Sequence, residues 1–204
     1  MKRQFRYRSI ILPALAVTGA AGLVVACATR RPSGNAQVPE PAKAVDLARY
    51  AGLWYELGRY DNSFERGCEA VTAAYSQGPD GLIQIINTCH QGGIDGRVRS
   101  AKGRSRVVEG SQNAKLKVSF FGPFFLGNYW VLDHADDYTW SIVGEPSGRY
   151  LWILTRDPLP GADVKEALIE RARALGYDMT MFRYTRQPPV RMDFNGSPAS
   201  PRPE

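Results

Sequence analysis

A series of short segments that alternate apolar and polar residues, running from Trp54 to Asp157, most constrains how this chain can fold. In the segment KLKVSF, residues 115–120, every second residue is apolar and the residues between are Lys and Ser. This period of two is that of a β-strand with one face in a core and the other in water. Gly, Pro, Asn and Asp separate the segments, which predicts strands joined by turns.

The number of these segments indicates the architecture. We expect strands at residues 54–60, 71–77, 82–89, 98–107, 115–122, 128–133, 139–144 and 149–157. The charged segment 98–107 is the least regular, and a solvated loop is its alternative reading. Eight short strands predict an all-β fold, an eight-stranded antiparallel up-and-down β-barrel, because closure leaves no unpaired strand edge. The interior of such a barrel is wide enough for one small ligand.

Helical patterns flank the strands. Residues 46–50 are expected to form one helical turn. Residues 162–175 have the pattern of a C-terminal α-helix packed on the outside of the barrel, with Asp163 as N-cap and Glu166 completing a capping box. Gly176 is expected to end this helix. Its apolar stripe consists of Val164, Leu168 and Leu175.

The N-terminus carries a targeting pattern. Residues 1–26 combine a basic start, an apolar stretch short for a membrane span and small residues at the end, as in a signal peptide. Cys27 directly after Ala26 resembles the bacterial lipobox, which implies a lipoprotein signal peptide and acylation of Cys27, for example by palmitate. A plain signal peptide with an incidental cysteine is the alternative. Removing the four positive charges of residues 1–26 from the net charge of +6 leaves +2, so we expect no nucleic-acid partner.

Composition predicts the remaining organisation. Residues 27–45 are rich in Pro and small polar residues and are interpreted as a flexible tether from lipidated Cys27. Residues 46–186 form the predicted barrel with its helix, and residues 179–185 fit a short final strand. The Pro-rich residues 187–204 are interpreted as a disordered tail.

Two cysteines flank the predicted GPDG hairpin turn, whose second glycine, Gly81, supplies a positive φ angle. Pairing Tyr75 with Ile83 across this turn places Cys68 one residue out of register with Cys89, and a β-bulge would bring the two opposite each other. A secreted chain folds in an oxidising compartment. We therefore predict a Cys68–Cys89 disulfide that staples the sheet, with two free thiols as the alternative.

Strand alternation predicts which side chains face the barrel interior. With Trp54 pointing inward at the closed end, every second residue of each strand follows. The predicted ligand-binding residues are Glu56, Gly58, Ala73, Tyr75, Ile85, Asn87, Val118, Phe120, Tyr129, Val131, Tyr150 and Trp152. Near the closed end, plain core packing is an equally good interpretation of these side chains.

Polar and aromatic groups refine this prediction. A carboxylate that faces an apolar interior is costly unless it is paired or protonated. Glu56 is therefore expected to bond groups at the barrel floor, which we favour, or to fix a polar ligand atom. Asn87 and Tyr129 are candidates to bond a headgroup or carboxylate. The apolar loop 121–126 either packs over the rim or forms a lip that touches a membrane or gates ligand entry.

The sequence contains no recognisable catalytic or metal-binding motif. Its two histidines, His90 and His134, have no partner at metal-ligand spacing, and the common nucleophile, nucleotide and zinc signatures are missing. We expect a binding protein with no catalytic residue, metal or cofactor, not an enzyme. The alternatives are an envelope enzyme acting on lipids or isoprenoids, and a barrel filled by its own side chains that acts through its surface.

Three stretches resemble the lipocalin family. Gly52 and Trp54 match the first family motif and Arg156 the third, which implies that Arg156 lies on Trp54 and closes the barrel. The segments WYELGRYDNSFERGCEAVTAAYS, LKVSFFGPFF and RYLWILTRDP are similar to those of bacterial outer-membrane lipoprotein lipocalins and their apolipoprotein-D-like relatives. The second motif is matched only loosely by ADDYTW, residues 135–140, which leaves the shape of this loop open.

The resemblance implies a cup that binds one hydrophobic small molecule, such as a fatty acid or lysophospholipid, for lipid storage, transport or envelope maintenance. It also implies an anchor in the outer membrane of a Gram-negative bacterium through acylated Cys27, with the domain facing the periplasm. A homodimer is left open.

Overall fold

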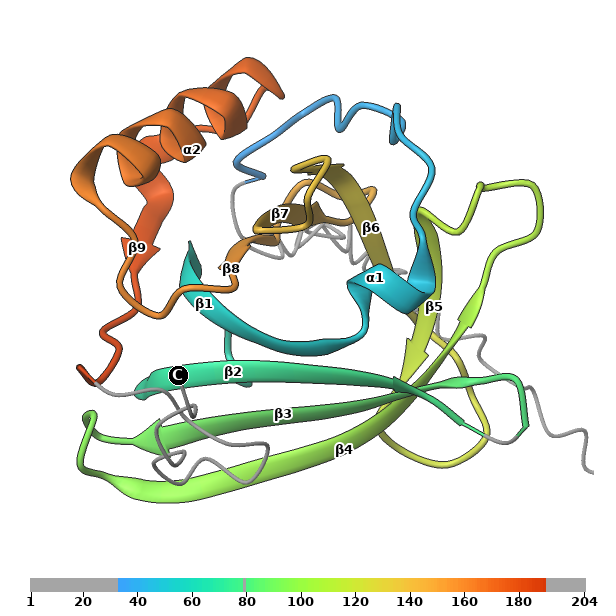
Figure 1. Ribbon diagram of the computed structural model, residues 1–204, viewed down its shortest axis with the longest axis horizontal. Coiled ribbons are helices and arrows are strands. Elements are labelled where there is room, and N and C mark those ends of the chain that lie inside the picture. The colour runs from blue at the N-terminus through green and yellow to red at the C-terminus, as the bar shows by residue number, and fades with distance from the viewer. Residues whose placement is uncertain (1–32, 79, 190–204) are drawn as a thin grey trace, which may run out of the picture. The chain divides into compact units, whose positions relative to one another are not determined.

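The structure, a computed structural model, describes residues 33–78 and 80–189. The predicted signal peptide, Cys27 and residues 190–204 of the predicted tail lie outside these residues. Within them, nine antiparallel strands form one sheet (Figure 1). The strands are β1 (Gly52–Tyr60), β2 (Cys68–Gln77), β3 (Ile83–Gln91), β4 (Arg97–Val107), β5 (Lys115–Ser119), β6 (Gly127–His134), β7 (Trp140–Gly144), β8 (Leu151–Thr155) and β9 (Phe182–Tyr184). All eight predicted strands are present, including the least regular one.

Strands β1 to β8 close into a barrel. Each strand from β2 to β8 pairs with the next, and β1 pairs with both β8 and β2. The predicted eight-stranded antiparallel up-and-down barrel is therefore confirmed. Because the strands alternate in direction, the β2–β3, β4–β5 and β6–β7 loops lie at one end, together with the helical turn before β1. We call this the closed end, and the end with the β1–β2, β3–β4, β5–β6 and β7–β8 loops the open end.

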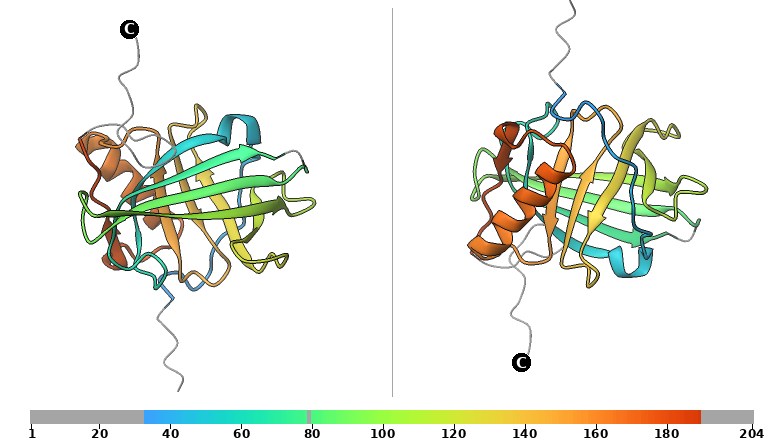
Figure 2. Two further views of the ribbon diagram at one scale, coloured as in Figure 1. Left: turned by 90° about the horizontal axis from the view of Figure 1, so that it is seen from below. Right: turned by 90° about the horizontal axis from the view of Figure 1, so that it is seen from above.

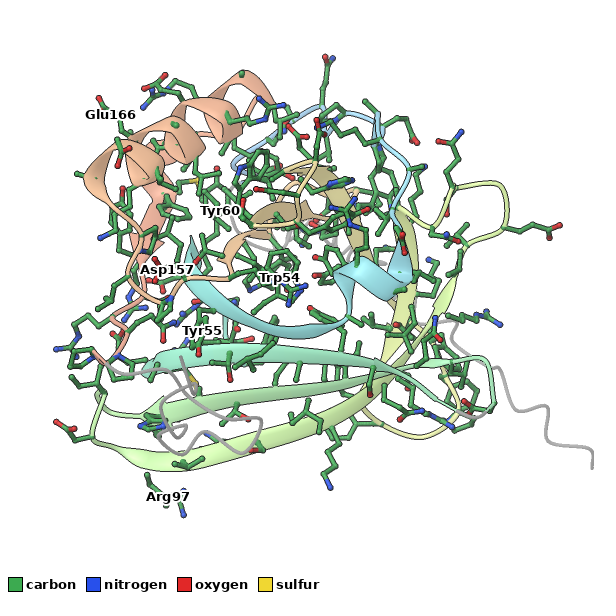
Figure 3. All side chains as sticks on the ribbon, viewed as in Figure 1. Trp54, Tyr55, Tyr60, Arg97, Asp157 and Glu166 are labelled. Carbon is green, nitrogen blue, oxygen red and sulfur yellow. A yellow bond between two sulfur atoms is a disulfide. The ribbon has the colours of Figure 1, made fainter. Side chains whose placement is uncertain are left out.

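The two faces of the sheet are buried against different partners. Residues directly opposite each other share a face, so Trp54, Ala73 and Asn87 line up across β1, β2 and β3 on the interior side. The outer face of β1, β6, β7 and β8 is covered by helix α2 (Ala162–Ala174), which packs Leu168 and Ala172 against it (Figure 2). In Figure 3, Trp54 lies in the interior, whereas Glu166 points away from the barrel on the far side of α2.

The helices follow the sequence pattern with one correction. Helix α1 (Leu47–Tyr50) is the predicted single turn, and the Asp46 carboxylate caps it by accepting from the amides of Ala48 and Arg49. The predicted capping box of α2 is wrong: its N-cap is Gly161, with no side-chain cap. The predicted stripe is wrong at Val164, whose side chain is exposed. The buried face of the helix is formed by Leu168 and Ala172.

The segment before α1 is more ordered than its composition predicts. Residues 33–45, predicted as part of a flexible tether, are hydrogen-bonded to the barrel domain. The Gly34 amide donates to the Gly148 carbonyl at 3.0 Å, and the buried Asn35 side chain donates to the Leu175 carbonyl at 2.9 Å. At the other end, the Val45 amide donates to the Gln112 carbonyl at 2.9 Å.

The C-terminal segment completes the barrel wall. Beyond Tyr55, strand β1 leaves β2 and pairs with β9, so that residues 182–187 fill the seam between β1 and β2. The Gln187 side-chain amide donates to the carbonyls of Glu56 and Val71, both at 2.9 Å, and bridges the two strands. Gln187, predicted as the first residue of a disordered tail, is therefore part of the folded domain.

Candidate ligand-binding site

The closed end of the barrel is plugged by Trp54 and Arg156. Trp54 is fully buried, and its indole N–H donates to the Tyr50 carbonyl at 2.8 Å. The Arg156 guanidinium carbon lies 3.7 Å from the centroid of the Trp54 ring, a cation–π geometry. The predicted pairing of these residues is therefore confirmed. Gly52 has a φ of +97°, and an added side chain would approach Arg156, so the motif needs glycine here.

Arg156 also caps the helical turn at this end. Its guanidinium donates to five backbone carbonyls, those of Arg49, Tyr50, Ala51 and Leu53 at 2.6 to 3.1 Å and that of Tyr138 at 3.4 Å. Carbonyls at the C-terminus of a helical turn have no partner within the helix, and a cation satisfies them. The loosely matched second motif contributes Tyr138, a residue not singled out from the sequence, whose hydroxyl accepts from the Asp46 amide at 2.8 Å.

A chain of hydroxyl groups lies just inside the plug. Tyr75 donates to the Tyr129 hydroxyl at 2.9 Å, Tyr129 bonds the Tyr50 hydroxyl at 2.8 Å, and Tyr50 bonds the Ser141 hydroxyl at 3.1 Å. Burial raises the pKa of the Tyr50 phenol to about 12 and that of Tyr75 further. These phenols stay neutral, so the floor of the barrel is polar but uncharged.

A buried cluster of charged groups lies in the wall further toward the open end. Glu56 bonds Arg59 and Thr185, and Arg59 also donates to the carbonyls of Glu65 (2.9 Å) and Cys68 (3.2 Å). Glu56 and Arg59 are both almost inaccessible to water. The favoured prediction, that Glu56 bonds groups at the barrel floor, is wrong in position, because the floor is formed by Trp54 and its neighbours, whereas Glu56 lies beside the β1–β2 seam.

Protonation of Glu56 follows from this environment. Desolvation and the nearby Glu65 carboxylate raise the pKa of Glu56 to about 8, against the opposing pull of Arg59. Glu65 in turn accepts a hydrogen bond from the Trp152 indole N–H at 3.0 Å. The cluster thus links the seam of the wall to an aromatic side chain that faces the interior.

Most residues of the predicted ligand-binding set do face the interior. The interior cluster contains Tyr75, Ile85 and Val131 as buried members and Ala73, Val118, Phe120, Tyr129 and Trp152 as partly buried members. Asn87 is directly opposite Ala73, and its side-chain oxygen has no hydrogen-bond partner among the described residues. Tyr150 stacks on Trp152 with ring centroids 5.6 Å apart. Whether these residues bind a ligand stays a prediction.

Gly58 is the exception, because the prediction that it lies on the same face of β1 as Trp54 is wrong. A β-bulge between Glu56 and Gly58 shifts the alternation of β1 by one residue. Gly58 is therefore opposite Ile153 on the outer face, where an added Cβ would lie 2.5 Å from the Phe182 ring. The same shift turns Arg59 inward, which no sequence pattern indicates, because Glu56 and Arg59 would lie on opposite faces of a regular strand.

The disulfide between Cys68 and Cys89 is present, with their Cα atoms 5.4 Å apart. The register used to predict it is wrong by two residues, since Tyr75 pairs with Ile85 and Cys68 with Gln91. The expected bulge does occur, between Glu69 and Thr72. The cysteines are diagonal neighbours, not opposite ones, which still lets their side chains meet.

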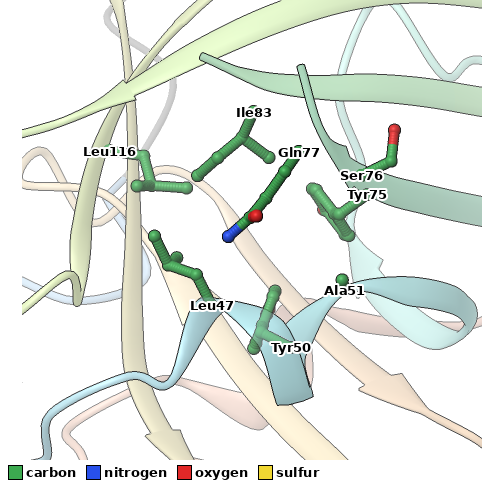
Figure 4. A pocket seen from close by; sticks show the side chains of 8 residues that line it. All are labelled: Leu47, Tyr50, Ala51, Tyr75, Ser76, Gln77, Ile83 and Leu116. Atoms are coloured by element: carbon green, nitrogen blue, oxygen red, sulfur yellow. The ribbon is translucent and has the colours of Figure 1, made fainter. Parts of the chain in front are cut away.

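The described residues form a small cavity and a larger open hollow at the barrel. A small cavity of about 10 Å³ lies between α1 and the strands at the closed end (Figure 4). Its lining residues are Leu47, Tyr50, Ala51, Tyr75, Ser76, Gln77, Ile83 and Leu116. A second hollow, of about 330 Å³ and open to solvent, is lined by Gln84, Lys102, Gly103, Arg104, Ser119, Phe120, Phe121 and Gly122.

The remaining chemistry is sparse in the part of the chain that the structure describes. There, no group of three or more His, Cys, Asp or Glu side chains is arranged to hold a metal ion. The His134 ring contacts the carbonyls of Ala135 (2.8 Å) and Ala44 (3.1 Å) and stacks on Tyr138, as a packing residue does. No helix within residues 33–78 and 80–189 has the length and apolarity needed to cross a membrane.

A barrel of eight strands plugged by a Gly-x-Trp strand and an arginine, with one helix outside, defines the lipocalin class. The family model described as "Lipocalin-like domain" matches residues 45–187, and the chain belongs to this family. Insecticyanin of the tobacco hornworm has the same fold, with a TM-score of 0.62 at 17% identity over 82% of this chain and 92% of that one.

Bacterial proteins are among the similar sequences. The outer membrane lipoprotein Blc of Escherichia coli K12 is 38% identical over 87% of this chain and 98% of its own length. Its namesake in Vibrio cholerae is 37% identical over 76% of this chain and 92% of its own length. Apolipoprotein D of the mouse is 31% identical over 61% of this chain and 68% of its own length.

Proposed function

We propose that this protein is a membrane-anchored lipocalin of the Gram-negative outer membrane that binds a single-chain lipid, a fatty acid or lysophospholipid, in its barrel. The acyl chain lies along the interior face, and acylated Cys27 holds the domain at the membrane, where it stores, carries or maintains lipids of the envelope. The similarity to outer membrane lipoproteins supports the location. Two acyl chains or more on one cysteine anchor a protein stably without a membrane-spanning helix.

The observation that carries the binding proposal is a gradient of burial along the interior face. Close to the closed end, Trp54, Leu116 and Val131 are at most 2% exposed. Toward the open end, Val118, Phe120 and Trp152 face the same interior but are only partly buried. Side chains that face inward and still reach solvent indicate interior space that the protein does not fill, as a ligand cup requires.

Polar groups along the interior suit a ligand with one polar end. Asn87 presents a side-chain oxygen that has no partner among the described residues, and the Tyr75–Tyr129–Tyr50 chain offers hydroxyl groups without charge. An apolar chain gains about 25 cal/mol per Å² of buried surface before the costs of association. We expect the apolar chain to supply affinity and these groups to orient the polar end.

Native mass spectrometry of the chain from residue 27 onward, with Cys27→Ser and purified without detergent, tests the proposal. We expect a discrete added mass that organic extraction identifies as a fatty acid or lysophospholipid. Trp152→Ala should weaken rebinding of that lipid about tenfold, because contact with a half-buried aromatic side chain contributes about 1.4 kcal/mol to the free energy of binding. Trp140→Ala is the matched control, because Trp140 lies on the outer face near α2. A chain that copurifies with no lipid and takes up none when it is added contradicts the proposal and favours a filled barrel.

For the alternative function, an envelope enzyme, the most plausible nucleophiles are the cysteine thiols, and these are not free. Cys68 and Cys89 are bonded to each other, so neither presents a thiolate. No other observation on the described residues favours catalysis over binding, and we propose no catalytic residue.

A further inference from the structure

Exposed apolar side chains gather at one end of the barrel. Eight large hydrophobic side chains of the described residues are exposed, and the four most exposed all lie in open-end loops. They are Phe121 (90%), Leu126 (81%) and Phe124 (69%) in the β5–β6 loop and Phe64 (61%) in the β1–β2 loop. Water-exposed aromatic rings on a loop tip are unfavourable unless another surface covers them.

The closed-end hairpin loops have the opposite character. None of the exposed large hydrophobic side chains lies in the β2–β3, β4–β5 or β6–β7 loop among the residues described. These loops instead expose the carboxylates of Asp80, Glu109, Asp136 and Asp137. The two ends of the barrel therefore differ in apolarity, and only the open end suits an apolar partner.

Cations flank the exposed aromatic loop. On the outer face of β4 and β5, Lys102, Arg104, Arg106 and Lys117 form no ion pair with any carboxylate of the described residues. Arg104 donates to the Gly122 carbonyl at 3.1 Å, and Arg106 lies 5.1 Å from the Phe125 ring centroid, so the cations are fixed beside the loop. The open hollow of about 330 Å³ lies between them, lined by Lys102, Arg104 and Phe121.

The N-terminal connection reaches the barrel at this same end. The Ser33 hydroxyl donates to the Ser147 carbonyl at 2.8 Å and the Gly34 amide to the Gly148 carbonyl at 3.0 Å, both in the β7–β8 loop. Six Cα–Cα steps separate Ser33 from Cys27 and span at most about 20 Å. A tether of this length keeps the open end, to which Ser33 and Gly34 are bonded, within about 20 Å of the membrane.

We propose that the open end of the barrel docks on an anionic phospholipid bilayer, with Phe121, Phe124 and Leu126 inserted at the headgroup level. Lys102, Arg104, Arg106 and Lys117 contact lipid phosphates, and the hollow between Arg104 and Phe121 receives a headgroup. The argument from the tether rests on the proposed acylation of Cys27, whereas the apolar loop and its cations do not. Docking in this orientation turns the mouth of the barrel toward the source of the lipid.

Hydrogen exchange of the full acylated chain reconstituted in vesicles tests this orientation. In vesicles of phosphatidylethanolamine and phosphatidylglycerol, we expect slower amide exchange in the β5–β6 loop than in detergent, and no change in the β4–β5 loop. Vesicles of phosphatidylcholine alone should protect the loop at least about 25-fold less, because each of the four cations contributes about a fivefold gain in partition at an anionic surface and two of them alone give about 25-fold. Protection of the closed-end loops, or of neither end, overturns the proposal.

Two pairs of variants complete the test. Phe121→Ser with Leu126→Ser should reduce the vesicle-dependent protection about tenfold, whereas Leu159→Ser, an exposed apolar residue outside the open-end loops, should not. Lys102→Gln with Arg106→Gln should reduce the preference for anionic vesicles about 25-fold, at about fivefold for each cation removed, and leave the part that Arg104 and Lys117 contribute. Lipid extraction from the same variants separates this proposal from ligand binding: a chain that retains its lipid but shows no loop protection has a working cup and no docking face.

Discussion

Replacing Arg156 with methionine is expected to lower the free energy of unfolding by about 4 kcal/mol. Of its five hydrogen bonds to backbone carbonyls, three are short and partly buried, one is exposed, and the one to Tyr138 is long at 3.4 Å. At about 1 kcal/mol for each of the three short, partly buried bonds, and about 1 kcal/mol for the cation–π contact with Trp54, the loss is about 4 kcal/mol. Against a total stability of about 5–15 kcal/mol for a domain, this is a large fraction.

Urea unfolding followed by tryptophan fluorescence measures this loss directly. A melting temperature roughly 10 °C lower should accompany it in a domain of this size. Arg156→Lys keeps the charge but not the planar fork, so about half of the loss is expected. Arg149→Met is the control, because Arg149 is exposed in the β7–β8 loop and should change stability by at most about 0.5 kcal/mol. A loss of less than about 1 kcal/mol for Arg156→Met would refute the reasoning that Arg156 holds the closed end together.

Three further variants test other parts of the fold. The pKa of Glu56 is about 8 in the folded protein and 4.5 as the ordinary value. Between these pH values the folded state keeps a proton on Glu56 that the unfolded state has lost, so the free energy of unfolding falls as the pH rises from about 5 to about 8. Glu56→Gln should therefore be less destabilising, relative to the parent, at the higher pH in urea titrations. Cys68→Ser with Cys89→Ser opens a loop with a sequence separation of 21 and should cost about 3 kcal/mol in the same assay, matching the effect of a reductant on the parent. Gly58→Ala should cost about 1–3 kcal/mol because the added methyl group meets the final strand, while Gly93→Ala, with its nearest atom at 3.9 Å, should cost far less.

The strands, the closure and the plug at the closed end could be predicted because each depends on local pattern. Alternation in KLKVSF identifies β5 with its inward Leu116 and Val118, and a Trp early in the first strand identifies the interior face of β1. The positive φ angle predicted for Gly81 in the β2–β3 turn is also confirmed, at +74°. The predicted length of this loop is wrong, because the loop spans five residues, whereas pairing Tyr75 with Ile83 assumed three.

The parts that could not be predicted depend on contacts between distant segments. The β-bulge in β1 lies where this strand pairs with β9, more than 120 residues later in the chain. Gly58, which has no side chain, leaves room there for the Phe182 ring. No local pattern in GLWYELGRY indicates that β9 packs against this strand. A prediction that leaves out the bulge therefore assigns Gly58 and Arg59 to the wrong faces of β1. The ordering of residues 33–45 has the same origin, since Asn35 is buried only through contacts with the end of α2.

The bulge and the seam together explain how the barrel tolerates charge in its wall. Turning Arg59 inward adds one positive charge beside two carboxylates, Glu56 and Glu65. With Glu56 protonated, as its raised pKa indicates at neutral pH, the cluster has one positive and one negative charge and is neutral as a whole. A net charge beside the interior would oppose the entry of an apolar chain, because charge in a low-dielectric region is costly. The C-terminal residues Thr185 and Gln187 complete this arrangement through their bonds to Glu56, so the segment after α2 stabilises the wall of the proposed cup itself.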